Sequence, residues 1–182
     1  MYIYSVGMTK FGKFLDKGMK QMTKEVLEAT KNDSNLDFKD IEAAWFSNCT
    51  WGLYENQHGI RGQVALSANR IDKIPIINVE NACASGSTAL HGAWATIKAG
   101  LYDCALAIGV EKIYNEDRKK MMQGFITYTD VEKTTAMVAQ LKKMAEKKRQ
   151  RTQKSRDLKY RKKKREDILL SWIFMQWQPA LT

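Results

Sequence analysis

Metal-ligand patterns, disulfide patterns and long apolar runs are all missing from this 182-residue chain. Its three cysteines, Cys49, Cys83 and Cys104, have neither the spacing of a metal site nor the density of a secreted disulfide scaffold. No segment is apolar over the length that a membrane span needs. The apolar run at the start, Met1 to Gly7, is too short for a signal peptide, and it lacks the basic residues that begin one. We therefore expect free thiols, no metal, no membrane partner and a cytoplasmic location.

The positive charge of the chain lies in one late block. The formal net charge is +10, and the stretch from Leu141 to Asp167 alone holds 14 Lys/Arg against 4 Asp/Glu. The remaining residues are therefore electrically balanced. A solvated charge run is the main interpretation of this block, and phosphate contacts with nucleic acid are the alternative. Because Tyr160 is its only interleaved aromatic residue, we expect no specific nucleic-acid partner.

Apolar segments alternate with amphipathic ones in the first part of the chain, which predicts an α/β fold. Strands are expected at 2–7, 43–47, 74–79 and 104–110. Helices are expected at 17–31, 57–69 and 85–99. The segment 74–79 is apolar on both faces, which is typical of a central parallel strand. The order βαβαβαβ predicts a mostly parallel sheet with flanking helices and right-handed crossovers.

The composition changes after about residue 140. We expect a domain at 1–140, with a loop region that begins near 113, and a basic, irregular helical tail at 141–182.

One cysteine stands where an apolar strand ends and a helix is expected to begin. It lies in the sequence Asn81-Ala82-Cys83-Ala84-Ser85-Gly86-Ser87. Free backbone N–H groups and the positive end of the helix dipole favour a thiolate at such a junction, and the small neighbours give a substrate access to the sulfur. The alternative is a buried structural cysteine. That interpretation is preferred for Cys49 and Cys104, because Cys104 begins an expected strand and Cys49 ends the segment 41–49 that carries one.

The Cys83 motif, followed by Ala89-Leu90, resembles the nucleophile motif of thiolases, in particular the sterol-carrier-protein-X type and its acetyl-CoA acetyltransferase-like relatives. The segments 6–11, 75–79, 100–112 and 129–132 are also similar to that subfamily. The resemblance covers about the first 140 residues. The cysteine motif alone would equally suit ketoacyl synthases, and its neighbours favour a thiolase.

The resemblance implies the N-terminal half of a thiolase-fold acyltransferase of lipid metabolism, which is a homodimer in the full-length family. Cys83 would attack an acyl-CoA thioester and hold the acyl group, and coenzyme A or a second acyl-CoA would then resolve it. Coenzyme A is thus a substrate, and no separate cofactor is expected. The backbone N–H of Cys83 or of a neighbour would stabilise the oxyanion. The expected substrate-binding residues are Ala84, Ser85, Gly86, Met121 and Met122.

The chain also departs from the family pattern. A thiolase's second half supplies a histidine that activates the nucleophile and a second cysteine, whereas the histidines here are His58 and His91. His91 lies two helical turns beyond Cys83, roughly 12 Å away, and His58 falls at the start of another expected helix. Neither histidine is expected to be the base. We expect a truncated chain that is inactive alone. The alternative is a non-catalytic, thiolase-like lipid-binding or interaction fragment.

The final residues suggest a reason for the departure. Codons for residues 171–180, read in another frame, can spell a segment that resembles thiolase sequence just beyond the start of the loop region. We therefore interpret 141–182 as an aberrant or frameshifted tail.

Overall fold

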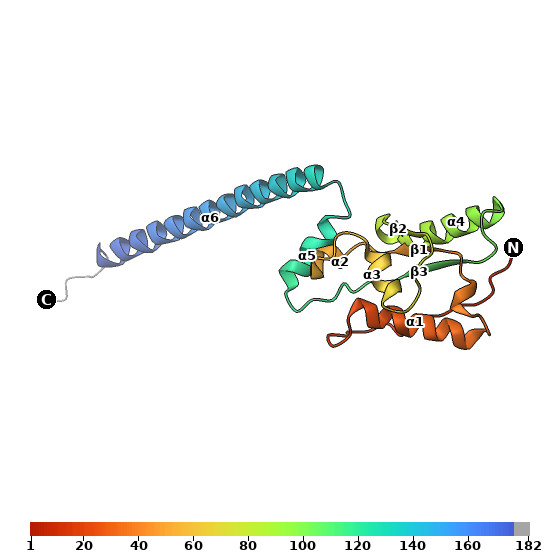
Figure 1. Cartoon of the computed structure of the whole chain (residues 1–182). Coiled ribbons are helices and arrows are strands. Elements are labelled where there is room, and N and C mark those ends of the chain that lie inside the picture. The colour runs from red at the N-terminus through yellow and green to blue at the C-terminus, as the bar shows by residue number, and fades with distance from the viewer. Residues whose placement is uncertain (177–182) are drawn as a thin grey trace. The chain divides into compact units, whose positions relative to one another are not determined.

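The structure is a computed structural model that describes the backbone of residues 1–176 and the side chains of residues 1–165. The chain divides into two compact units, Met1–Tyr128 and Thr129–Thr182. In chain order (Figure 1), the first unit contains α1 (Met19–Asp33), η1 (Phe38–Asp40), β1 (Ala43–Ser47), α2 (Trp51–Glu55), α3 (Arg61–Ser67), β2 (Ile76–Val79), η2 (Ala82–Ala84), α4 (Ser85–Lys98), β3 (Ala105–Gly109) and α5 (Arg118–Ile126). The second unit contains α6 (Val131–Gln176).

The sheet of the first unit has three parallel strands in the order β2-β1-β3. Ala44 pairs with Ile76 on one side and with Leu106 on the other. Parallel strands require long crossovers. The crossover from β1 to β2 contains α2 and α3, and that from β2 to β3 contains α4. The structure therefore confirms the predicted α/β class.

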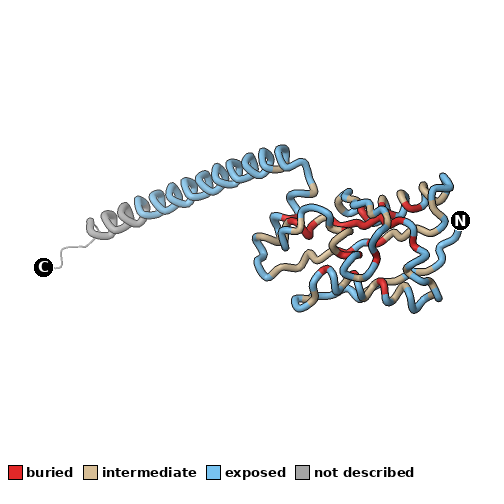
Figure 2. Tube along the Cα trace, in the orientation of Figure 1, coloured by how far each residue is buried: buried red, intermediate tan, exposed pale blue. Residues whose placement is uncertain are grey.

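Alternate residues of β1 face two separate cores. Ala44 and Phe46 pack with the apolar residues of α1 and α3, such as Leu27 and Leu66. Ala43 and Trp45 instead pack against α4. Both faces of β1 are therefore covered, and all five of its residues are buried, as the red segment within the sheet shows (Figure 2). The result is a three-layer unit with helices on both faces of the sheet, as Figure 1 shows.

Helix α4 lies close to the sheet because it carries a glycine where it crosses Trp45. A Cβ at Gly92 would collide with Trp45 Nε1. Ala89 and Ala93, one helical turn apart, are also buried there. The small residues of this helix therefore serve close packing, while Leu90 and Trp94 remain 52% and 44% exposed.

Two predictions about strands are wrong. Residues 2–7 form no strand. Within the described part of the chain this segment pairs with no strand backbone and is held by α1, where Ser5 donates to the Thr30 carbonyl and Val6 N–H donates to Asp33. The strand at 74–79 is not central either. Because β2 is at the edge of the three-stranded sheet, Ile77 is 39% exposed, and β1 takes the central place.

The expected helices form with altered bounds. The segment 57–69 contains only the shorter α3, and the sequence did not predict α2. Ile60 has a φ of +45°, so the helix begins after it, and the Ile60 side chain is exposed. Leu66 is fully buried instead.

Helix α6 is 46 residues long and contains neither glycine nor proline. Its Lys, Arg, Glu, Gln and Ala residues are good helix formers, which explains its continuity through the basic block. Every side chain from 135 to 165 is exposed. Across the described residues, no helix has both the length and the apolar character needed to cross a bilayer.

Candidate active site

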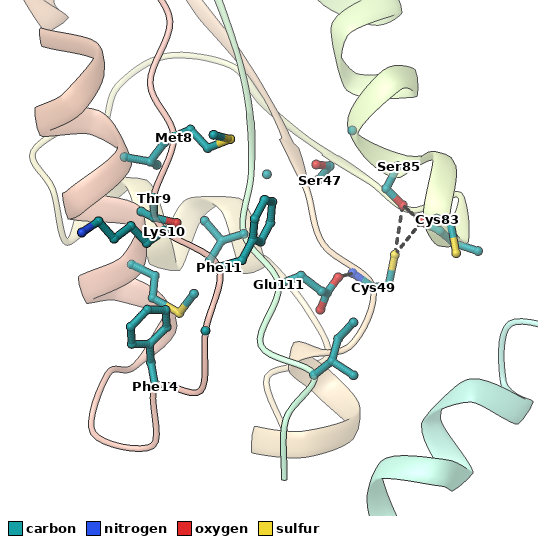
Figure 3. Close-up of a pocket in the computed structure, with 18 of the residues that line it drawn as sticks. Met8, Thr9, Lys10, Phe11, Phe14, Ser47, Cys49, Cys83, Ser85 and Glu111 are labelled. Atoms are coloured by element: carbon teal, nitrogen blue, oxygen red, sulfur yellow. Dashed lines mark hydrogen bonds between the residues drawn. The ribbon is translucent and has the colours of Figure 1, made fainter.

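A pocket of about 470 Å³ lies where β1 and β3 end and α4 begins (Figure 3). The polar wall of the pocket is formed where these strands end and α4 begins. It includes Ser47, Cys49, Cys83, Ser85 and Glu111. Its apolar wall comes from the N-terminal segment 7–14, from α1 and from the segment around α5, with Phe11, Phe14, Met22, Phe125 and Tyr128 among the side chains. Ligands of open parallel sheets commonly bind at the carboxyl ends of the strands. This position makes the pocket the candidate active site.

Cys83 lies on the short η2 turn between β2 and α4. The turn ends where Ala84 N–H donates to the Asn81 carbonyl at 2.9 Å and Ser85 N–H donates to the Ala82 carbonyl. Cys83 is exposed and lines the pocket. The predicted strand-to-helix junction at the cysteine is therefore present, and the thiol is open to a ligand in the pocket.

Ala82, which precedes Cys83, adopts a left-handed backbone conformation with a φ of +45°. Such a conformation is uncommon for a residue other than glycine, and it persists only where the surroundings hold it. Its N–H donates to Glu80 Oε1 at 2.7 Å, and its carbonyl accepts from Ser85 Oγ at 2.7 Å. Both ends of the residue are therefore held by polar side chains of the same turn.

Cys49 follows β1 and reaches this turn from the neighbouring strand. Its sulfur donates to the Ala82 carbonyl at 3.1 Å and lies 3.0 Å from Ser85 Oγ. Figure 3 shows the Cys49 sulfur directed toward Ser85 and Glu111 beside the Cys49 backbone. The pocket thus brings together two of the three cysteines, which the sequence did not predict.

Glu111, just beyond β3, anchors the loop that carries Cys49. Its carboxylate accepts from the N–H groups of Cys49 at 2.8 Å and Thr50 at 2.9 Å, and from the Asn48 amide at 3.2 Å. The Thr50 hydroxyl also donates to it. Four donors on one carboxylate fix the ends of β1 and β3 relative to each other.

Burial and this carboxylate act on the titratable groups around the pocket. Burial, and then the negative charges of Glu111 and Glu80, raise the pKa of the Cys49 thiol above its ordinary value of 9.0. Burial and Glu111 likewise raise the pKa of Tyr128 and of Tyr54. The pKa of Cys104 is raised by burial and by Asp40 and Glu42. Cys49 is thus held as a neutral thiol at physiological pH, which suits a donor rather than a nucleophile.

The structure places the expected substrate-binding residues differently. Ser85 and Gly86 line the pocket with Cys83, whereas Ala84 does not. Met121 and Met122 also lie outside the lining: the Met121 carbonyl accepts from the Tyr54 hydroxyl, and Met122 is 57% exposed. Phe125 and Tyr128, in the same part of the chain, line the pocket instead.

Neither histidine lines the pocket. His58 packs close to Gly52, and His91 lies beside Trp94 on α4. In the part of the chain that the structure describes, no group of three His, Cys, Asp or Glu residues is placed to hold a metal ion. The titratable and nucleophilic side chains that line the pocket are two thiols, a carboxylate, an ammonium group and several hydroxyls, from Cys49, Cys83, Glu111, Lys10, Thr9, Ser47, Ser85 and Tyr128.

Cys49 and Glu111 are site residues that the sequence interpretation missed. Because Cys49 ends the segment 41–49 that carries an expected strand, the sequence predicts a buried cysteine with a structural role. Its contact with Ala82 joins residues 33 positions apart, and Glu111 contacts Cys49 over 62 positions. One signal was available, because the carboxyl ends of neighbouring parallel strands meet at one edge of a sheet.

Comparison with known proteins identifies the family. The model of the thiolase N-terminal domain matches residues 1–167. Acetyl-CoA acetyltransferases of Methanothermobacter thermautotrophicus and Methanocaldococcus jannaschii are 32% and 34% identical over 111 residues, which is 61% of this chain and 29% and 28% of theirs. Sterol carrier protein 2 of Bos taurus is 34% identical over 115 residues, 62% of this chain and 20% of that protein.

A solved structure of 3-oxoacyl-[acyl-carrier-protein] synthase III from Aquifex aeolicus aligns with a TM-score of 0.47 and 16% identity, covering 54% of this chain and 31% of that one, a likeness too distant to carry an argument. The chain spans less than a third of the length of the curated relatives named above. The family match extends over most of the chain and includes the Cys83 turn and the pocket beside it. The chain therefore belongs to the thiolase family, whose N-terminal domain it carries.

Proposed function

We propose that the chain carries the acyl-accepting half-site of a thiolase-type acyltransferase, and that Cys83 is the acylated residue. The single observation that carries the proposal is the position of this cysteine. It is exposed on a turn at the start of α4 and faces a pocket with an apolar wall. The thiol is thus accessible, while side chains such as Phe11 and Phe125 offer a surface for an acyl chain.

The proposed step is an acyl transfer. The Cys83 thiolate attacks the carbonyl carbon of an acyl-CoA thioester and the bond between that carbon and the coenzyme A sulfur breaks. Coenzyme A leaves as a thiolate that takes a proton from solvent. Ala84 N–H and Ser85 N–H already donate within the turn, which leaves the Cys83 N–H as the candidate oxyanion donor.

A second acyl-CoA or coenzyme A would resolve the acyl-enzyme. That step needs a base, and no histidine lines the pocket in the described residues. We therefore infer one acylation per chain without turnover. Coenzyme A acts as a substrate here. The homodimer that the resemblance implies and the cytoplasmic location expected from the composition belong to the same proposal.

Acylation can be measured directly. The full chain is incubated with acetyl-CoA and, separately, with a longer saturated acyl-CoA, and each cysteine-containing peptide is examined by mass spectrometry. We expect one hydroxylamine-sensitive acyl group on the Cys83 peptide, none in Cys83→Ser, and an unchanged yield in the control Cys104→Ser. Acylation spread equally over the three cysteines would contradict the proposal.

A second candidate function is lipid binding without catalysis. The observations that favour it are the apolar pocket wall and the absence of histidine from the lining. In that case a long-chain acyl-CoA would bind and shield Cys83 from alkylation, yet no acyl-enzyme would form, and Cys83→Ser would bind as tightly as the wild type.

A further inference from the structure

The Ala82 carbonyl collects three donors from two elements. Ser85 supplies its hydroxyl at 2.7 Å and its backbone N–H, and the Cys49 thiol approaches at 3.1 Å from the end of β1. Of these donors, only the thiol comes from outside the turn. Together with the 3.0 Å approach of the same sulfur to Ser85 Oγ, this contact ties the Cys83 turn to the end of β1.

The contact acts on a strained residue. Ala82 holds a φ of +45°, a conformation that costs an alanine about 1–2 kcal/mol relative to the right-handed one. When donors that hold such a residue are removed, its peptide rotates toward ordinary values and moves the residue that follows. That residue is Cys83.

The Cys49 side is itself fixed. Glu111 accepts from the Cys49 N–H at 2.8 Å and from the Thr50 N–H at 2.9 Å, so the loop that carries the thiol is bound to the end of β3. Burial and the Glu111 and Glu80 carboxylates raise the pKa of the Cys49 thiol, so it keeps its proton. A connected path thus runs from β3 through the Cys49 loop to the Ala82 carbonyl.

We propose that Cys49 and Ser85 are positioning residues that hold the Ala82 peptide and so fix the orientation of Cys83 in the pocket. Ser85 thereby acts through its bonds to Asn81 and Ala82 in addition to lining the pocket. This inference rests on the proposed function, in which Cys83 accepts the acyl group.

The test compares cysteine variants of the full chain. Cys49→Val removes the donor, Cys49→Ser keeps one, and Cys104→Val is the matched control at a half-buried cysteine that does not line the pocket. The measured quantity is the rate constant for alkylation of Cys83 by iodoacetamide, peptide by peptide and as a function of pH. Acylation of Cys83 by acetyl-CoA is measured in parallel.

We expect Cys49→Val to lower the alkylation rate of Cys83 about two- to fivefold, the range of one weak hydrogen bond. The Ala84 and Ser85 amides, which donate within the turn, should exchange faster. Cys49→Ser should recover most of the rate, and Cys104→Val should leave it unchanged. The urea midpoint identifies any variant whose loss of rate is a loss of fold. Ser85→Ala, with Cys49 intact, provides a second route to the same loosened turn.

The outcomes separate the two proposals. If wild-type Cys83 is not acylated and is no faster than Cys49 or Cys104, the proposed function fails. Faster exchange at the Ala84 or Ser85 amide in Cys49→Val would then still support the positioning role. If wild-type Cys83 is acylated, but neither Cys49→Val nor Ser85→Ala changes its alkylation rate or the exchange of the Ala84 amide, the positioning role is overturned and the proposed function stands.

Discussion

Phe46 and Ala44 of β1 have no exposed surface, whereas every side chain of α6 from 135 to 165 is exposed. The strand is stabilised by layers of helix on both faces, so its conformation depends on residues far away in the chain. Helix α6 gains its regularity from local bonds and helix propensity. A mutation in the first unit should therefore change stability through side-chain packing. A mutation in the second unit should act through helix propensity and local bonds.

The largest difference in stability between the two units is expected when an aromatic side chain is removed from the core. Phe46→Ala deletes a fully buried side chain next to Leu66 and Leu27, which should cost about 3–5 kcal/mol. Leu158→Ala, at a position 58% exposed in α6, should change stability by less than about 0.5 kcal/mol. Urea unfolding, monitored through hydrogen exchange of the β1 amides, measures the stability of both variants. Equal losses of stability in the two variants would contradict the expected difference.

A smaller contrast comes from adding or removing one methyl group. In Gly62→Ala the new Cβ would lie 2.6 Å from Phe46 Cβ and 2.8 Å from Ile76 Cγ2. We expect a loss of about 1–3 kcal/mol from overpacking between α3 and the sheet. Ala145→Gly in exposed α6 should cost about 1 kcal/mol through helix propensity alone. Circular dichroism during urea unfolding separates the two, and a neutral Gly62→Ala would contradict the close packing.

Alkaline pH should weaken only the first unit. Burial and the charge of Glu111 raise the pKa of Tyr128, and burial raises that of Cys49, above their ordinary values of 10.0 and 9.0. The folded state then holds these protons more tightly than the unfolded state, so their stabilisation is complete below the ordinary values and is lost as pH rises above them. The urea midpoint should fall above about pH 9.

Two tyrosine variants sharpen this comparison. Tyr128→Phe removes one of the groups and should flatten the pH dependence. Tyr160→Phe, 69% exposed in α6, is the matched control and should leave the dependence as it is. A wild-type midpoint that stays constant between about pH 8 and pH 10.5 would contradict the sign of the linkage.

The smallest effect concerns salt and α6. Lys143, Lys147 and Arg151 follow one another at four-residue intervals, and like charges at this spacing destabilise a helix by about 0.2–0.5 kcal/mol per pair. Raising the salt concentration from about 10 mM to about 500 mM screens them, so ellipticity at 222 nm should become more negative. Lys147→Glu replaces both repulsive pairs with attractive ones, and an equal salt response in this variant would refute the explanation.

Much of the fold follows from local pattern. The segment 43–47 was predicted residue for residue as β1, and the helix expected at 85–99 appears as α4, because apolar strands and a long small-residue helix show strong periodicity. The segment 2–7 failed, since strand-like alternation forms a strand only with a partner. The edge position of β2 was also missed. Apolar composition shows that a segment can be buried, whereas strand order depends on how the whole sheet assembles.

The junction at Cys83 and its small neighbours could be inferred from the sequence alone, because strand, turn and helix are contiguous there. The acyl transfer that we propose for Cys83 came from the resemblance to thiolases. Only the tertiary structure decided what surrounds that junction. It placed Cys49, Glu111 and the aromatic residues of the N-terminal segment around one pocket, and it left both histidines outside. The physical reason is distance along the chain: contacts that span 33 and 62 positions arise when parallel strands align their carboxyl ends, and no local pattern encodes them.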